Sequence, residues 1–209
     1  MKVYFFTGQR RIGDIAFDGC VALRRDCKWK KFQIVNKVSK LEIEKKKFDA
    51  DIIISFLNPY IFSKSQLKKV KYAVNIHPSS PSHPGNDPDA WTIYDGTYVS
   101  GATLHFMNEK VDNGPIIDFI EKKVPKTARM SQISEISEHL SLALLLENLN
   151  NILDGKLKTS KQKWSKNKRN RLAFKKKCHI DRSISKKELN LRIKSFHNKD
   201  YKNRLYVKL

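Results

Sequence analysis

Three polar residues next to apolar runs could together catalyse a reaction at an acyl carbon. Asn75 and His77 end a β-prone run that Pro78 stops, and Asp112 opens the turn Asp-Asn-Gly-Pro. An imidazole has an unperturbed pKa of about 6.5 and can act as a general acid or base. On an extended backbone Asn75 and His77 project to the same side, so the amide could stabilise an oxyanion beside the imidazole. Asp112 could orient His77 or accept a proton.

The same residues also have purely structural interpretations. Asn-x-His-Pro is a weak signal, because a histidine at a strand end often makes only structural hydrogen bonds, and Asp-Asn-Gly is a common turn sequence. His105 lies inside an apolar run, and we interpret it as a hydrogen-bonded core histidine. No Ser or Cys stands in a nucleophile-elbow setting. If these residues are catalytic, the attacking group must therefore belong to the substrate.

The elements that position these residues alternate between strand and helix. Short apolar runs bounded by turn residues predict strands, and apolar residues at helical spacing predict helices. We expect strands at 2–7, 29–35, 51–56, 72–76, 102–107 and 116–124, and helices at 15–23, 63–69, 90–94, 131–153 and 185–196. Any helix in the charged connection 37–47 should be brief. This alternation predicts an α/β fold with a mostly parallel sheet and helices on both faces.

The chain is strongly basic, with 42 Lys and Arg against 21 Asp and Glu, and the excess concentrates after Asp154. A net charge of +21 indicates attraction to anions and says nothing about the fold. A nucleic acid, an anionic membrane surface and a phosphorylated substrate are candidate partners, and a simple solvated surface is the alternative. Arg10 and Arg11 follow the first predicted strand, where they are either phosphate contacts or exposed loop cations.

Other features limit the location and the cofactors. No run approaches the roughly 20 apolar residues that a membrane span needs, and the start of the chain lacks a secretory signal. We therefore expect a cytoplasmic protein without a membrane span. Cys20, Cys27 and Cys178 form no Cys-x-x-Cys and no zinc spacing, so we predict no metal site, and we expect Cys20 and Cys27 to pack as small hydrophobic residues.

The motifs 75–79 (Asn-Ile-His-Pro-Ser), 101–105 (Gly-x-Thr-x-His) and 112–116 (Asp-x-Gly-x-Ile) resemble, in order and separation, those of the formyltransferases that use 10-formyltetrahydrofolate. The resemblance covers roughly residues 1–155 and is clearest from 51 to 124. It implies a Rossmann-like catalytic domain at 1–155 that binds folate, followed by a short basic α/β segment at 156–209.

The resemblance also implies roles for individual residues. The substrate amine would attack the formyl carbon of the cofactor, His77 and Asn75 would stabilise the oxyanion, and Asp112 would orient His77 and assist proton removal. No metal is required. The residues expected near the cofactor are Phe56, Leu57, Asn58, Tyr60, Val111 and Asp112, and the candidate substrate contacts are Arg10, Arg11, His83 and Trp91.

The amine acceptor is less well defined by the resemblance. Relatives commonly carry Leu-Leu-Pro after His-Pro-Ser, whereas this chain has the reshaped loop 80–85 (Ser-Pro-Ser-His-Pro-Gly). The tail of about 50 residues is too short for the C-terminal barrel of the tRNA-acting members and resembles the nucleotide-sugar formyltransferases. We therefore expect a nucleotide-linked amino sugar used for surface polysaccharide, with glycinamide ribonucleotide and methionyl-tRNA as alternatives.

A different class of function is a nucleic-acid-binding protein on an inactive formyltransferase core. The charge of +21 favours it, but the intact Asn75, His77 and Asp112 oppose it, so we do not expect a nucleic acid partner. The apolar edge at 116–124 and the final helix are candidate surfaces for a homodimer.

Overall fold

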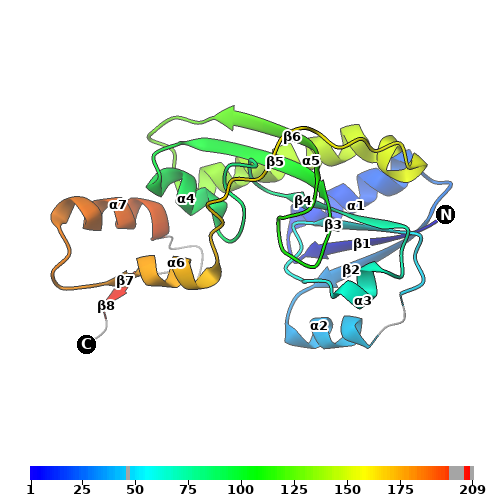
Figure 1. The fold of residues 1–209 in the computed structure, drawn as a ribbon, viewed down its shortest axis with the longest axis horizontal. Helices are drawn as coiled ribbons and strands as arrows, with labels where there is room; N and C mark the ends of the chain where they lie inside the picture. The colour runs from blue at the N-terminus through cyan, green and yellow to red at the C-terminus, as the bar shows by residue number, and fades with distance from the viewer. Residues whose placement is uncertain (46–47, 198–204, 208–209) are drawn as a thin grey trace.

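The computed structural model describes residues 1–45, 48–197 and 205–207, and its centre is a six-stranded sheet (Figure 1). The strand order is β2-β1-β3-β4-β5-β6. The parts of the predicted C-terminal segment at 198–204 and 208–209, and the end of the connection at 46–47, lie outside the described residues. The strands are β1 (Lys2–Gly8), β2 (Lys28–Ile34), β3 (Ile52–Phe56), β4 (Tyr72–His77), β5 (Val99–Phe106) and β6 (Ile116–Lys123).

The direction of the strands changes within the sheet. Strands β1 to β4 are parallel to one another, whereas β5 is antiparallel to β4 and β6 is antiparallel to β5. Every residue of β3 is buried, as its unbroken apolar run requires in the middle of a covered parallel sheet. The carboxyl ends of β1, β3 and β4 therefore lie at the same end of the sheet. Strand β5 starts at that end and runs in the opposite direction.

Helices cover both faces of the sheet. On one face α1 (Arg11–Leu23) and α5 (Met130–Asp154) bury Ala16, Leu144 and Leu149 against the sheet. The other face is covered by α2 (Lys37–Glu44), α3 (Lys64–Leu67) and their loops, in an aromatic-rich core that includes Phe6, Phe32 and Phe62. Gly155 ends α5 in the left-handed conformation, as expected of a helix C-cap.

A separate hydrophobic cluster joins the basic C-terminal segment to the body through α4 (Pro88–Tyr94). Aromatic rings pack edge to face there, and the ring centroid of Phe196 is 5.0 Å from that of Trp91 and 5.4 Å from that of Phe174. This segment contains α6 (Arg171–Cys178), β7 (His179–Ile180), α7 (Lys186–Phe196) and β8 (Tyr206–Val207). The three cysteines are free and buried, as expected for Cys20 and Cys27. No helix among the described residues is long and apolar enough to cross a bilayer.

Helix α6 was not predicted from the sequence, because only Phe174 and Cys178 of its eight residues are buried and three of the others are lysines. Its start is defined by Asn170, whose side chain accepts a hydrogen bond from the backbone N–H of Ala173 at 2.8 Å. The two-residue strands β7 and β8 are too short to leave a period-2 pattern in the sequence. Both features depend on tertiary contacts with α4 and α7.

Two leucine variants test the placement of α5. Leu149 is 1% exposed in the main core, whereas Leu172 on α6 is 60% exposed. Leu149→Ala should lower the free energy of unfolding by about 2–5 kcal/mol through lost burial and a cavity. Urea denaturation measures this change. Leu172→Ala is the matched control and should stay within about 0.5 kcal/mol of wild type; equal losses in the two variants would contradict the assigned packing.

Candidate active site

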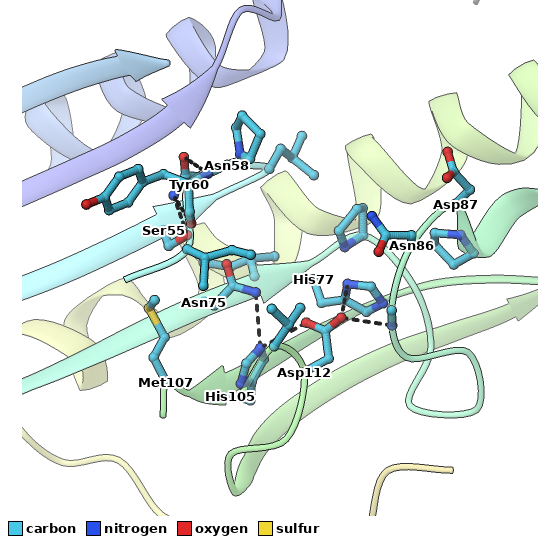
Figure 2. Close-up of a pocket in the computed structure, with 18 of the residues that line it drawn as sticks. Ser55, Asn58, Tyr60, Asn75, His77, Asn86, Asp87, His105, Met107 and Asp112 are labelled. Atoms are coloured by element: carbon cyan, nitrogen blue, oxygen red, sulfur yellow. Dashed lines mark hydrogen bonds and ion pairs between the residues drawn. The ribbon is translucent and has the colours of Figure 1, made fainter. Parts of the chain in front are cut away.

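The antiparallel pairing of β4 with β5 brings a histidine beside Asn75. In the register of the two strands Asn75 is directly opposite His105, and such cross-strand pairs have neighbouring side chains. The Asn75 Nδ2 and His105 Nε2 atoms are 3.0 Å apart, and Figure 2 shows the two side chains facing each other. His105 is therefore hydrogen-bonded, as the sequence predicted, but its partner is a candidate catalytic residue.

The hydrogen bonds of His105 determine which way the Asn75 amide points. His105 Nδ1 is 2.8 Å from the carbonyl oxygen of Phe106, which can only accept, so Nδ1 carries the proton. Burial lowers the pKa of His105 to about 4, which keeps the ring neutral and leaves Nε2 as an acceptor for Asn75 Nδ2–H. The second Nδ2–H of Asn75 is then free to donate into the cavity that this residue lines.

The carboxylate of Asp112 lies at the centre of the site. Asp112 adopts the left-handed conformation with φ of 43°, in the turn between β5 and β6. Its Oδ2 accepts a 2.9 Å hydrogen bond from the backbone N–H of Gly85 and is 3.4 Å from His77 Nδ1. Its Oδ1 is 3.7 Å from His105 Nε2. Three chain segments therefore meet at one carboxylate whose side chain is only 4% exposed.

His77 is held between two acceptors. Its Nε2 donates to the carbonyl oxygen of His83 at 3.1 Å, while its Nδ1 faces the Asp112 carboxylate. Both ring nitrogens therefore lie near oxygen atoms, which fixes the orientation of the imidazole beside the carboxylate. The pair can hold a proton and exchange it beside Asn75, which is what general acid–base chemistry at an acyl carbon requires.

A cavity of about 650 Å³ opens above these residues. Its lining includes apolar side chains, two of which are unusually exposed, Ile61 at 67% and Val111 at 43%. The lining also includes the charged residues Arg10, Arg171, Asp87 and Asp89. Burial raises the pKa of Asp89 to about 7 and also raises that of Asp87. The cavity thus combines apolar with charged residues, and Asn75, His77 and Asp112 are among those that line it.

Most of the predicted site residues line this cavity. They are Arg10, Leu57, Asn58, Tyr60, Asn75, His77, Val111 and Asp112. Four predicted residues lie elsewhere. The Phe56 ring packs in the main core, Arg11 is exposed at the start of α1, and Trp91 belongs to the cluster around Phe196. His83 contributes its backbone carbonyl to His77, but its side chain is buried beside Thr97 and Asp95.

Sequence reasoning missed Arg171, Asp87 and Asp89 as lining residues, and missed the bond of His105 to Asn75. For His105 the contact depends on the antiparallel register of β4 with β5, which the two apolar runs alone do not specify. For Arg171 and the two aspartates no local signal exists, since each belongs to a helix or loop whose position is set by tertiary packing.

The sequence matches the family described as "Formyl transferase" over residues 25–148. The chain therefore belongs to the formyl transferase family, which confirms the resemblance. A methionyl-tRNA formyltransferase of Rickettsia typhi is 34% identical over 108 residues, which are 51% of this chain and 36% of that protein. The chain thus matches only about a third of the length of that curated relative.

Solved structures resemble this fold over its full length. A sugar N-formyltransferase from a Shewanella species has a TM-score of 0.82 and 19% identity, covering 99% of this chain and 92% of that one. An N-formyltransferase from Helicobacter canadensis, solved with folinic acid and dTDP-3-aminofucose, has a TM-score of 0.75 and 17% identity, covering 100% and 84%. These similarities confirm the predicted α/β formyltransferase fold.

The buried His105 predicts a specific dependence of stability on pH. Its pKa is about 4 in the folded chain against 6.5 as the ordinary value, so the unfolded state binds the proton first as the pH falls. The contribution of neutral His105 to the free energy of unfolding is fully present above pH 6.5 and is lost as the pH falls toward 4. The total loss from this residue is about 3 kcal/mol. His105→Gln should therefore show a shallower loss of unfolding free energy than wild type between these pH values.

Urea denaturation at pH 7, 5.5 and 4.5 measures the difference. His139 is an exposed histidine on α5, so His139→Gln is the matched control and should follow the wild-type curve. Parallel pH curves for wild type and His105→Gln would refute the assigned protonation state of His105.

Proposed function

We propose that this protein is an N-formyltransferase that moves a formyl group from 10-formyltetrahydrofolate to the amine of a nucleotide-linked amino sugar. One observation carries the proposal: Asn75, His77 and Asp112 lie together on the cavity wall in a chain of the formyl transferase family. The hydrogen bond of Asn75 to His105 leaves its amide able to donate to an oxyanion, and the contact of His77 with Asp112 allows those two residues to handle a proton.

The apolar residues that line the cavity fit the cofactor. Ile61 and Val111, which are exposed, and Tyr60 provide an apolar surface against which a flat pterin could pack. A cavity of about 650 Å³ is of the size typical for such ligands. Lys40 and Lys110 also line it and complement the carboxylates of the folate tail. When bound, 10-formyltetrahydrofolate supplies an activated formyl group.

The chain's own groups then act on charge and protons. Asn75 donates its free Nδ2–H to the formyl oxygen as negative charge develops there, and His105 keeps the amide in that orientation. The His77 imidazole lies beside the Asp112 carboxylate and can take up and release a proton. Asp112, paired with His77, assists removal of the proton that the attacking amine loses. In the net reaction, the amine would give up one proton and gain the formyl group, and the folate nitrogen would gain a proton in its place.

The charged residues that line the cavity support an amino sugar as acceptor. Arg10 and Arg171 place two cations there for phosphate groups, and Asp87 and Asp89 offer hydrogen-bond partners for sugar hydroxyls. Arg10 is paired with Glu138 in this structure, so a phosphate would share or replace that partner. The similarity to structures of sugar N-formyltransferases over nearly the whole chain supports the same choice.

Methionyl-tRNA is the second candidate acceptor, because the curated relative at 34% identity is a methionyl-tRNA formyltransferase. The match covers only half of this chain, however, and the family match at residues 25–148 ends before the segment that contains Arg171. Nothing specific in the cavity favours glycinamide ribonucleotide. The assembled Asn75, His77 and Asp112 argue against an inactive core that only binds nucleic acid. The cytoplasmic location and the homodimer stay predictions.

Removing the imidazole of His77 tests the proposed centre. His77→Ala should reduce formyl transfer by at least about a thousandfold, since both the imidazole beside the oxyanion and the proton relay are lost. Binding of 5-formyltetrahydrofolate, measured by calorimetry, should remain detectable because the apolar residues that line the cavity are unchanged. His139→Ala is the matched control and should keep wild-type turnover; turnover near wild type in His77→Ala would exclude the proposed role.

An acceptor array identifies the substrate. Nucleotide-linked amino sugars, glycinamide ribonucleotide and methionyl-tRNA are each offered with 10-formyltetrahydrofolate, and mass spectrometry detects the formylated product. We expect an amino sugar nucleotide to be formylated. Arg171→Ala should raise KM for that acceptor about tenfold or more while leaving KM for the formyl donor unchanged. Formylation of methionyl-tRNA alone would overturn the sugar assignment and leave formyl transfer itself intact.

A further inference from the structure

The chain that follows α5 runs back across the catalytic centre. Its backbone N–H groups donate to three carbonyls, from Ser160 to Ile116 at 2.7 Å, from Ser165 to Pro81 at 2.9 Å and from Arg169 to Pro84 at 3.1 Å. We name residues 160–169 the anchor segment. It is fastened to the start of β6 and to the loop 80–86, and these two regions flank the turn and the strand end that supply Asp112 and His77.

Trp164, in the middle of the anchor segment, packs against both active-site histidines. Its ring centroid is 5.0 Å from that of His105 with an interplanar angle of 87°, and 5.8 Å from that of His77 with an angle of 69°. Its Nε1–H donates to the carbonyl oxygen of Gly114 at 2.8 Å, two residues beyond Asp112. Within the described chain, both histidines line the cavity and Trp164 does not. The indole therefore covers the imidazoles away from the cavity.

We propose that Trp164 is a positioning residue that fixes the rings of His77 and His105 and shields them from water, with the anchor segment as its support. Edge-to-face contacts between rings have a preferred geometry, so one indole that meets two imidazoles restricts both. Where the proposal concerns turnover it rests on the proposed formyl transfer. Where it concerns the state of the histidines it does not.

The shielding matters because Asn75 depends on a neutral His105. The charged and titratable groups that face His105 are Asp112, which favours its protonation, and His77 and Lys168, which oppose it. Burial is the largest influence and keeps the pKa of His105 low. Without the indole, water reaches the ring and its pKa should rise. A protonated His105 would donate from Nε2 and could no longer accept from Asn75, so the amide would lose its orientation.

The other end of the anchor segment holds the loop that His77 contacts. The Arg169 guanidinium lies 3.2 Å from both carboxylate oxygens of Asp95 and 4.4 Å from the centre of the Trp91 ring. The backbone of Arg169 also accepts from Asn86 N–H at 2.9 Å. The loop 80–86 is thereby fixed, and it includes the His83 carbonyl that accepts from His77. The same segment thus positions His77 from two directions.

The experiment compares Trp164→Ala and Trp164→Phe with a matched tryptophan elsewhere. Trp29 is also half-buried, packs edge-on against Phe17 at 6.3 Å and donates its Nε1–H to a backbone carbonyl at 2.9 Å, but it lies on β2, away from the cavity. Trp29→Ala is therefore the control for a purely structural loss. The histidine ring signals are titrated by NMR in the ligand-free full chain, and formyl transfer is measured over the same pH range.

Trp164→Ala should raise the pKa of His105 by at least one unit toward 6.5 and lower kcat about a hundredfold, with KM for 10-formyltetrahydrofolate changing less than about threefold. The acidic limb of the pH–rate profile should move to higher pH. Trp164→Phe keeps an aromatic ring and should restore most of both properties, and Trp29→Ala should alter neither.

An unchanged His105 titration in both Trp164 variants would overturn the inference, whatever the turnover. Equal losses in Trp164→Ala and Trp29→Ala would also overturn it, because they would indicate general destabilisation. Absence of formyl transfer from the wild type would count against the proposed function alone. The NMR titration would then still decide the role of Trp164.

Discussion

The burial of the Asp112 carboxylate is the constraint on which the site depends. A carboxylate that is 4% exposed needs hydrogen-bond donors or cations around it, because an unpaired buried charge is very costly. Its neighbours come from β4, from β5 and from the loop that contains Gly85. A Cβ at Gly85 would collide with the Arg169 carbonyl oxygen, so the close approach of loop and anchor segment requires glycine there.

The change of strand direction between β4 and β5 makes this convergence possible. In a purely parallel sheet, the carboxyl end of β4 would lie beside the carboxyl end of its neighbour. Here β5 runs the other way, and the register of the two strands places Asn75, two residues before the end of β4, opposite His105, one residue before the end of β5. The turn that follows β5 then returns over the same edge and brings Asp112 to His77.

Much of this arrangement could be read from the sequence, and the exceptions have physical causes. Buried strands such as β3 are recognisable in the sequence because a short, continuous apolar run bounded by turn residues is typical of a buried strand. Asn75 and His77 were recognisable because they end such a run. The bond between His105 and Asn75 depends on strand register, which a single apolar run does not specify. Trp164 stands in a basic, polar segment without periodicity, so its contacts follow only from the hydrogen bonds that fasten its neighbours.

The basic C-terminal segment is a component of the site in this structure, although composition alone separates it at residue 155. It contributes Arg171 to the cavity wall and Trp164 to the rear of the histidines. The loop 80–86 is held by the same segment through Arg169. Reshaping that loop would therefore also displace the His83 carbonyl and, with it, His77. The geometry of His77 is mechanically linked to the loop 80–86, and a change in that loop requires compensation in the anchor segment.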